Sequence, residues 1–144
     1  MQVPGGMETK SVHLASFPEV NPVWADPKLA EQWERLLQYR TQVQGVLEGS
    51  RRDKVIGSSL EAHVRIEAGG ESFTFLNGYQ RDLSALCIVS QVVLTENPAL
   101  SGDVRVVVSK SQAGKCERCW NYREAVGTFP DHPTLCDRCV EAIR

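Results

Sequence analysis

Four cysteines near the end of the chain constrain its fold more than any other feature. They form two C-x2-C pairs, Cys116 with Cys119 and Cys136 with Cys139, and sixteen residues separate the pairs. A tight turn lets each pair aim both sulfurs at one point, and four thiolates then complete a tetrahedron around zinc. Four protein ligands leave no open position, so the spacing predicts one zinc ion with a structural role and no catalytic one.

Two disulfides and buried unpaired cysteines are the competing interpretations of this pattern. Disulfides need an oxidising compartment, and the N-terminal sequence MQVPGGMETKS lacks the apolar segment of a secretory signal. The fifth cysteine, Cys87, lies in the apolar stretch LSALCIVSQVVL, where a thiol packs as a small hydrophobic group. The pattern therefore favours zinc and a cytoplasmic protein.

Charge and hydropathy narrow the classes of partner. The formal net charge of the 144 residues is −2, so nucleic-acid binding would have to come from a local arrangement of cations. No apolar run approaches the roughly 20 residues that a membrane span needs, and we expect no membrane partner. The sequence also lacks a Gly-rich phosphate loop, a nucleophile elbow and paired catalytic carboxylates, so we expect no catalytic residues.

A long helix is predicted from residue 26 onward, after an extended linker over residues 1–25. Asp26 supplies an N-cap oxygen and Pro27 suits the first helical position. Apolar residues then follow at helical spacing to about residue 50: Leu29, Trp33, Leu36, Leu37, Val43 and Leu47. Basic residues follow at Arg51, Arg52 and Lys54. They are either a solvated surface or a surface for a phosphate backbone.

A small sheet is predicted next. Residues 61–68 alternate between apolar and polar, as in a half-buried strand. Gly69-Gly70 is predicted to turn the chain, residues 71–84 to form a helix, and residues 87–96 and 104–110 to form strands that pair antiparallel with each other. The expected fold class is α+β: a long N-terminal helix, a β-α-β-β sheet and a C-terminal four-cysteine zinc knuckle. The expected domains are 1–25 (linker), 26–56 (helix), 57–112 (βαββ unit) and 113–144 (zinc finger).

Three residues of the knuckle are candidate RNA contacts. Trp120 follows a ligand cysteine directly, so its ring either covers the zinc site or stacks on a base. Arg118 and Arg138 hold the same position in the two pairs, where a rigid scaffold would fix their donors.

The sequences KCERCW and LCDRCV resemble the C-terminal zinc finger of bacterial isoleucyl-tRNA synthetases. The resemblance extends to KVIGSSLEAHV (54–64), to SVHLASFP (11–18) and to the helix with Trp33, Arg40, Val43 and Glu48. It covers about residues 10–142. DNA-repair glycosylases carry a related finger, with glycine after the second cysteine and an Arg-Ser/Thr run before the third. Here Trp120 and Pro133-Thr134-Leu135 stand at those positions, which argues against a glycosylase.

The resemblance implies that the chain is the tail of a class I synthetase that joins isoleucine to its tRNA using ATP. It implies that residues 26–56 are the end of the helical anticodon-binding domain, and that this piece assists binding of the tRNA near its anticodon arm. It implies one structural zinc on the four cysteines, and isoleucine tRNA and the remainder of the synthetase as partners, with no DNA partner. Arg118, Trp120, Arg138, Arg51, Arg52 and Lys54 are then candidate tRNA contacts. The alternative is a zinc-stabilised protein-interaction module that docks through the apolar stripe of the helix without touching RNA.

Overall fold

The computed structural model describes residues 11, 13, 17 and 19–143 of the chain. Contacts divide the chain between Glu34 and Arg35, and the two parts are described separately. The elements are η2 (Pro22–Trp24), α1 (Pro27–Arg52), η3 (Ser59–Glu61), β1 (Ala62–Ala68), α2 (Gly70–Asn77), α3 (Leu83–Cys87), β2 (Gln91–Glu96), β3 (Val104–Lys110), β4 (Gly114–Lys115), β5 (Tyr122–Arg123) and α4 (Asp137–Glu141).

The first part holds the short 3-10 turn η2 and the start of α1. Much of the predicted 1–25 linker lies outside the described residues. Asp26 caps α1 as predicted, because its Oδ1 accepts hydrogen bonds from the backbone N–H groups of Lys28 (3.0 Å) and Leu29 (3.1 Å). Those two bonds satisfy donors that have no partner inside the helix.

The helix α1 ends at Arg52, four residues before the predicted domain boundary. Lys54 takes the left-handed conformation with φ +59°, and Val55 N–H donates to the carbonyl of Ser50 at 2.9 Å. This is a common way to stop a helix, because it satisfies a carbonyl of the last turn.

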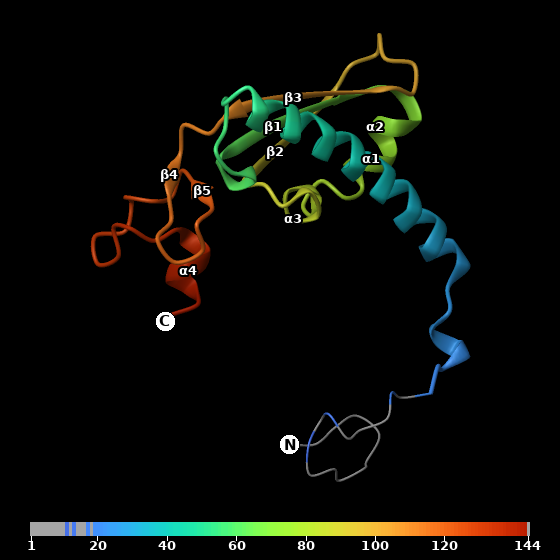
Figure 1. The fold of residues 1–144 in the computed structure, drawn as a ribbon, viewed down its shortest axis with the longest axis horizontal. Helices are drawn as coiled ribbons and strands as arrows, with labels where there is room; N and C mark the ends of the chain where they lie inside the picture. The colour runs from blue at the N-terminus through green and yellow to red at the C-terminus, as the bar shows by residue number, and fades with distance from the viewer. Residues whose placement is uncertain (1–10, 12, 14–16, 18, 144) are drawn as a thin grey trace. The chain divides into compact units, whose positions relative to one another are not determined.

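The sheet of the second part has the strand order β2-β1-β3 (Figure 1). The strand β1 pairs parallel with β2 and antiparallel with β3. The predicted antiparallel pairing of β2 with β3 is therefore wrong. Alternate residues of β1 are all buried (Ala62, Val64, Ile66 and Ala68), so this strand takes the central place and the other two flank it. The parallel pair needs a crossover connection, which α2 and α3 supply.

The predicted helix over residues 71–84 is two helices in the structure. The first ends at Asn77, beside the weak point at Gly78, and the second begins at Leu83. Gly69 does not form a turn but precedes α2 as its N-cap. A Cβ at Gly69 would lie 1.7 Å from the carbonyl oxygen of Leu100, so the close approach of these two backbone segments requires glycine.

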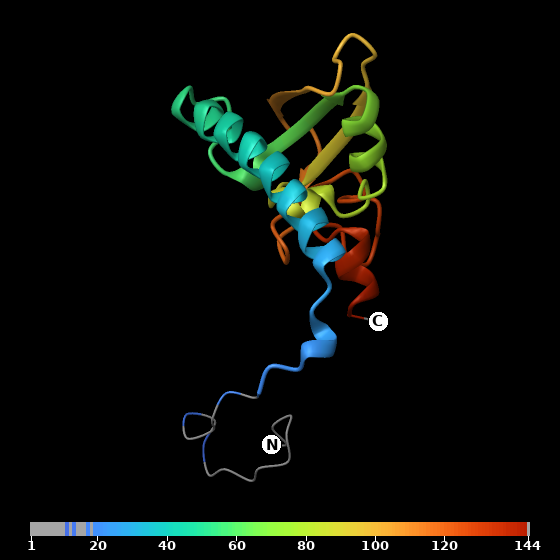
Figure 2. The ribbon, with the colours of Figure 1, turned by 90° about the vertical axis from the view of Figure 1, so that its right-hand side faces the viewer.

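The sheet of the second part packs on one apolar core. Val43 and Leu47 of α1, Leu76 of α2 and Leu83 of α3 join the buried residues of β1 in a single cluster. Figures 1 and 2 show the later turns of α1 crossing the sheet. Of the other residues of the apolar stripe, Leu36 is buried, whereas Leu29, Trp33 and Leu37 are exposed.

Cys87 is buried as predicted, but it ends α3 and does not begin a strand, so the predicted strand 87–96 starts at Gln91. Burial raises the pKa of its thiol to about 11. Among the described residues no helix is long and apolar enough to cross a membrane.

Candidate metal centre

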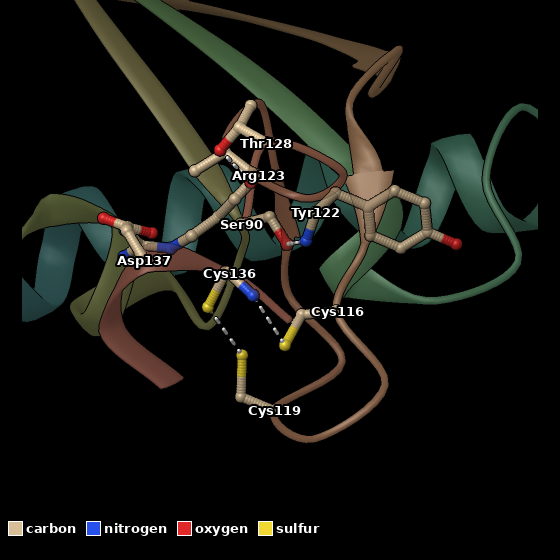
Figure 3. Close-up of polar contacts among 9 residues, drawn as sticks. Ser90, Cys116, Cys119, Tyr122, Arg123, Thr128, Cys136 and Asp137 are labelled. Carbon is tan, nitrogen blue, oxygen red and sulfur yellow. Dashed lines mark hydrogen bonds and ion pairs between the residues drawn. The ribbon is translucent and has the colours of Figure 1, made fainter. Parts of the chain in front are cut away.

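The four predicted ligand cysteines come together at one point. Their Sγ atoms all lie within 4.8 Å of one another. Cys116 and Cys119 come from the loop after β4, and Cys136 and Cys139 from the start of α4. The sulfurs of Cys119 and Cys136 are 3.7 Å apart (Figure 3). That distance excludes a disulfide between them. It matches the separation of about 3.8 Å that a tetrahedron with Zn–S bonds of about 2.3 Å requires.

Backbone geometry presents the sulfurs to one point. The N–H of Cys136 donates to Sγ of Cys116 at 3.3 Å, which joins the two pairs (Figure 3). Trp120 N–H donates to the carbonyl of Cys116 at 2.8 Å, and this closes the first turn. Trp120 takes φ +64°, the left-handed conformation that the tight turn demands.

The electrostatics of the cluster call for a cation. Burial, together with the facing thiols, raises the pKa of Cys136 to about 12. Burial also opposes ionisation of Cys116, but hydrogen bonds from the backbone N–H groups of Cys119, Cys136 and Arg118 outweigh it and lower the pKa of Cys116 to about 6. Four facing thiols do not ionise together by themselves, whereas a bound metal ion stabilises all four thiolates.

Apolar burial contributes little to this part of the chain. Three of the cysteines form its buried core, and Cys119, Val126 and Leu135 pack against them. The hairpin β4–β5, which the sequence did not predict, carries the first pair. Arg123 of β5 donates to both carboxylate oxygens of Asp137 at 3.2 Å and so ties the hairpin to α4 (Figure 3). We call residues 114–143 the finger.

The finger is joined to the sheet by a residue that the sequence did not single out. The hydroxyl of Ser90 donates to the carbonyl of Leu60 at 2.6 Å. The same hydroxyl accepts the backbone N–H of Tyr122 at 2.7 Å (Figure 3). Ser90 lies in the middle of the apolar run that predicted a strand, so no local pattern could have marked it. In the segment between β3 and the finger, Ser111 N–H donates to the carbonyl of Glu61 at 2.7 Å.

The candidate RNA contacts on the finger have different surroundings. Trp120 is 63% exposed, which contradicts the interpretation that its ring covers the zinc site. Lys115 Nζ lies 5.7 Å from the centroid of this ring. Arg118 Nη1 lies 3.6 Å from Cys139 Sγ, and this contact raises the pKa of the guanidinium. Arg138 is exposed.

The candidate contacts at the end of α1 form a separate group. Arg51 donates to Glu48 and to Ser59, so it holds the end of α1 to η3. Arg52 and Lys54 are exposed, and Asp53 lies 4.0 Å from Arg52. No hydrogen bond or ion pair within the described part of the chain joins these residues to Arg118, Trp120 or Arg138.

A family model described as a zinc finger found in FPG and IleRS matches residues 114–142. The match coincides with the finger, and together with the clustered thiols it identifies a structural zinc site.

Matches to full-length proteins extend beyond the finger. The isoleucine–tRNA ligase of Geobacter sulfurreducens is 43% identical over 141 residues, which cover 93% of this chain and 15% of that protein. Those of Thermoanaerobacter sp. strain X514 (41% over 143 residues) and Syntrophotalea carbinolica (41% over 145 residues) match 93% and 96% of this chain, and 15% and 16% of their own lengths. The chain thus spans about 15% of the length of the curated relatives it matches.

Proposed function

We infer that this chain is a region of an isoleucine–tRNA ligase and propose that its task there is to help hold tRNA. The matches over nearly the whole chain support the first statement. The longer protein would join isoleucine to its tRNA in the cytoplasm using ATP, with catalytic residues outside this chain. The remainder of the ligase is the second proposed partner.

The observation that carries the tRNA proposal is the exposed ring of Trp120. Covering a large exposed aromatic ring is favourable, because it removes apolar surface from water. Here a zinc-held turn fixes its backbone, so the ring can accept a base with little further ordering. Lys115 stands beside the ring, where it adds a positive charge close to a stacked nucleotide.

The arginines of the finger would add phosphate contacts to the base stacking of Trp120. Arg118 keeps donors in addition to the one directed at Cys139, and Arg138 lies exposed on α4. Guanidinium groups bind phosphate with two parallel hydrogen bonds. At the end of α1 we assign phosphate contact to Arg52 and Lys54 and not to Arg51, because Arg51 is used within the chain.

The test is binding of an isoleucine tRNA transcript to this chain at several salt concentrations. We expect affinity to fall as salt rises, since phosphate contacts release counterions. Replacing a stacking aromatic costs about 1–3 kcal/mol per base, so Trp120→Ala should weaken binding by roughly 5-fold to 150-fold. Trp33→Ala is the matched control, because Trp33 is also exposed but lies on α1. Equal affinities for wild type and Trp120→Ala would refute the proposal.

A protein-docking module is the second candidate function, and the exposed apolar residues of α1 favour it. Leu29, Trp33 and Leu37 are all exposed at helical spacing. The remaining part of the ligase would supply the covering surface, since this chain spans about 15% of its relatives' length. Apolar docking responds little to salt, so tRNA affinity independent of salt and of Trp120 would favour docking as the sole function.

A further inference from the structure

A hollow of about 230 Å³ opens between α3 and the finger. Ser84 and Ile88 line it from the α3 side, and Asn121, Arg123 and Arg138 line it from the finger. Its lining holds two guanidinium groups, hydroxyls and an amide, but no carboxylate. The two neighbouring hollows differ, because Glu124 lines both and Asp137 also lines the larger one. Among these hollows, this one alone has the lining that suits an anion.

The cations of the hollow have donors to spare. The guanidinium of Arg138 makes no hydrogen bond or ion pair with any residue in the described part of the chain, although its backbone carbonyl accepts from Ala142 within α4. Arg123 uses Nη1 for Asp137, and this leaves its other nitrogens for a ligand (Figure 3). The finger, which carries both arginines, is held to the sheet, because the Ser90 hydroxyl bonds to Tyr122 of the finger and to Leu60 beside the sheet. A phosphate in this hollow would therefore find the donors of Arg138 and Arg123 already in position.

Backbone strain gathers at the rim of the same hollow. Ile88 has φ +56° and ψ +50°, a conformation that a β-branched residue rarely adopts, and its side chain is 55% exposed. Trp120, which immediately precedes Asn121, is also left-handed and exposed. Residues held in unfavourable conformations cluster at sites that bind ligands. Here one of them, Ile88, lines the hollow, and the other, Trp120, directly precedes a lining residue; both are exposed to solvent.

We propose that this hollow binds one backbone phosphate of an RNA strand, next to the base that stacks on Trp120. Arg138 and Arg123 donate to the phosphate oxygens, the hydroxyl of Ser84 adds a neutral donor, and Ile88 packs against the adjoining ribose. The inference rests on the proposed function and deepens it, because it names the phosphate site that accompanies the stacked base.

The experiment compares Arg138→Gln with Arg105→Gln in binding to an isoleucine tRNA transcript over a range of salt concentrations. Arg105 is an exposed arginine on β3 and does not line the hollow. Its replacement by glutamine therefore makes the same change of charge away from the proposed site. Losing one phosphate contact should make the slope of log K against log salt shallower by about 0.7–0.9. We expect this change for Arg138→Gln and none for Arg105→Gln. Both variants must retain one zinc per chain.

A second measurement locates the phosphate. Anticodon stem-loops of the tRNA, each with one uncharged methylphosphonate, are titrated against wild type and Arg138→Gln. We expect one position where the modification weakens binding to wild type but not to Arg138→Gln, because the contact is already lost in the variant. Equal losses for both proteins at every position would overturn the proposal.

The outcomes separate this inference from the function on which it rests. If Trp120→Ala weakens binding while Arg138→Gln and Arg105→Gln behave alike, the tRNA role stands and the hollow is not its phosphate site. If wild type shows no salt-dependent binding to the transcript, the proposed function fails, and the phosphate site fails with it.

Discussion

The sheet and the finger are stabilised in different ways although Ser90 links them directly. The sheet buries a continuous apolar cluster to which three helices and all three strands contribute. In the finger the buried cluster is three cysteines, with three partly buried residues against them, and Val140 is the one further buried apolar residue among the described residues of the finger. Apolar burial stabilises by about 25 cal/mol per Å², so the finger has little stability from this source. Hydrophobic packing stabilises the first region, and metal binding must stabilise the second.

The largest effect should follow from removing a zinc ligand. Cys136→Ser should abolish the finger's fold, because the apparent free energy of structural zinc sites, about 10–16 kcal/mol, is the folding free energy of such small regions. We expect loss of zinc and fast amide exchange over residues 114–143, with protection retained in β1. The measurements are zinc content and hydrogen exchange followed by mass spectrometry.

Cys87→Ala is the control for that experiment. Cys87 is buried in the apolar cluster, away from the four clustered thiols, so its replacement should leave one zinc per chain. If Cys136→Ser instead kept a full complement of zinc and slow exchange in the finger, a four-thiolate site would be wrong.

The next largest effect should follow from removing a buried apolar side chain from the core of the sheet. Leu47 of α1 is fully buried at 0% exposure, so Leu47→Ala should lower the free energy of unfolding of the sheet by about 2–5 kcal/mol. Zinc content should not change. Chemical denaturation monitored by far-UV circular dichroism measures the first quantity, and elemental analysis measures the second. Leu37→Ala, at an exposed position of the same helix, should have a much smaller effect.

The two regions also differ in how well the sequence predicted them. The spacing of Cys116, Cys119, Cys136 and Cys139 specifies ligand number and geometry by itself, because metal coordination leaves few alternatives. The start of α1 could also be predicted from neighbouring residues alone, because Asp26 and Pro27 each favour a helix N-terminus. The alternation in β1 predicted its buried face correctly, because one face of that strand packs on the core.

Long-range features could not be predicted in this way. The short connection between β2 and β3 suggested a hairpin, but the buried face of β1 took the central position in the sheet. The apolar run that contains Cys87 and Ile88 suggested a strand, whereas Cys87 ends α3 and Ile88 turns the chain in a left-handed conformation. The exposure of Trp120 depends on how the finger folds, which no local pattern records.

A smaller effect should appear where the two regions meet. Ser90→Ala removes a hydroxyl that bonds to both Leu60 and Tyr122. Leaving those partly buried backbone groups unpaired should cost about 1–3 kcal/mol. We expect faster exchange of the Tyr122 amide with zinc content unchanged, and Ser90→Thr should restore much of the protection. If Ser90→Ala left that amide as protected as in wild type, the hydroxyl would not couple the finger to the sheet.

The smallest effect concerns the ion pair inside the finger. Arg123 and Asp137 are partly exposed, with side-chain exposures of 39% and 52%, and exposed pairs contribute about 0.2–1 kcal/mol. Arg123→Gln should therefore leave zinc content unchanged and increase exchange in β5 slightly, with a smaller difference at high salt. A large loss of zinc in this variant would mean that the pair, and not the metal alone, maintains the finger. The distinction between the two regions would then be weaker than their cores suggest, because ordinary side-chain contacts would share the role assigned to zinc.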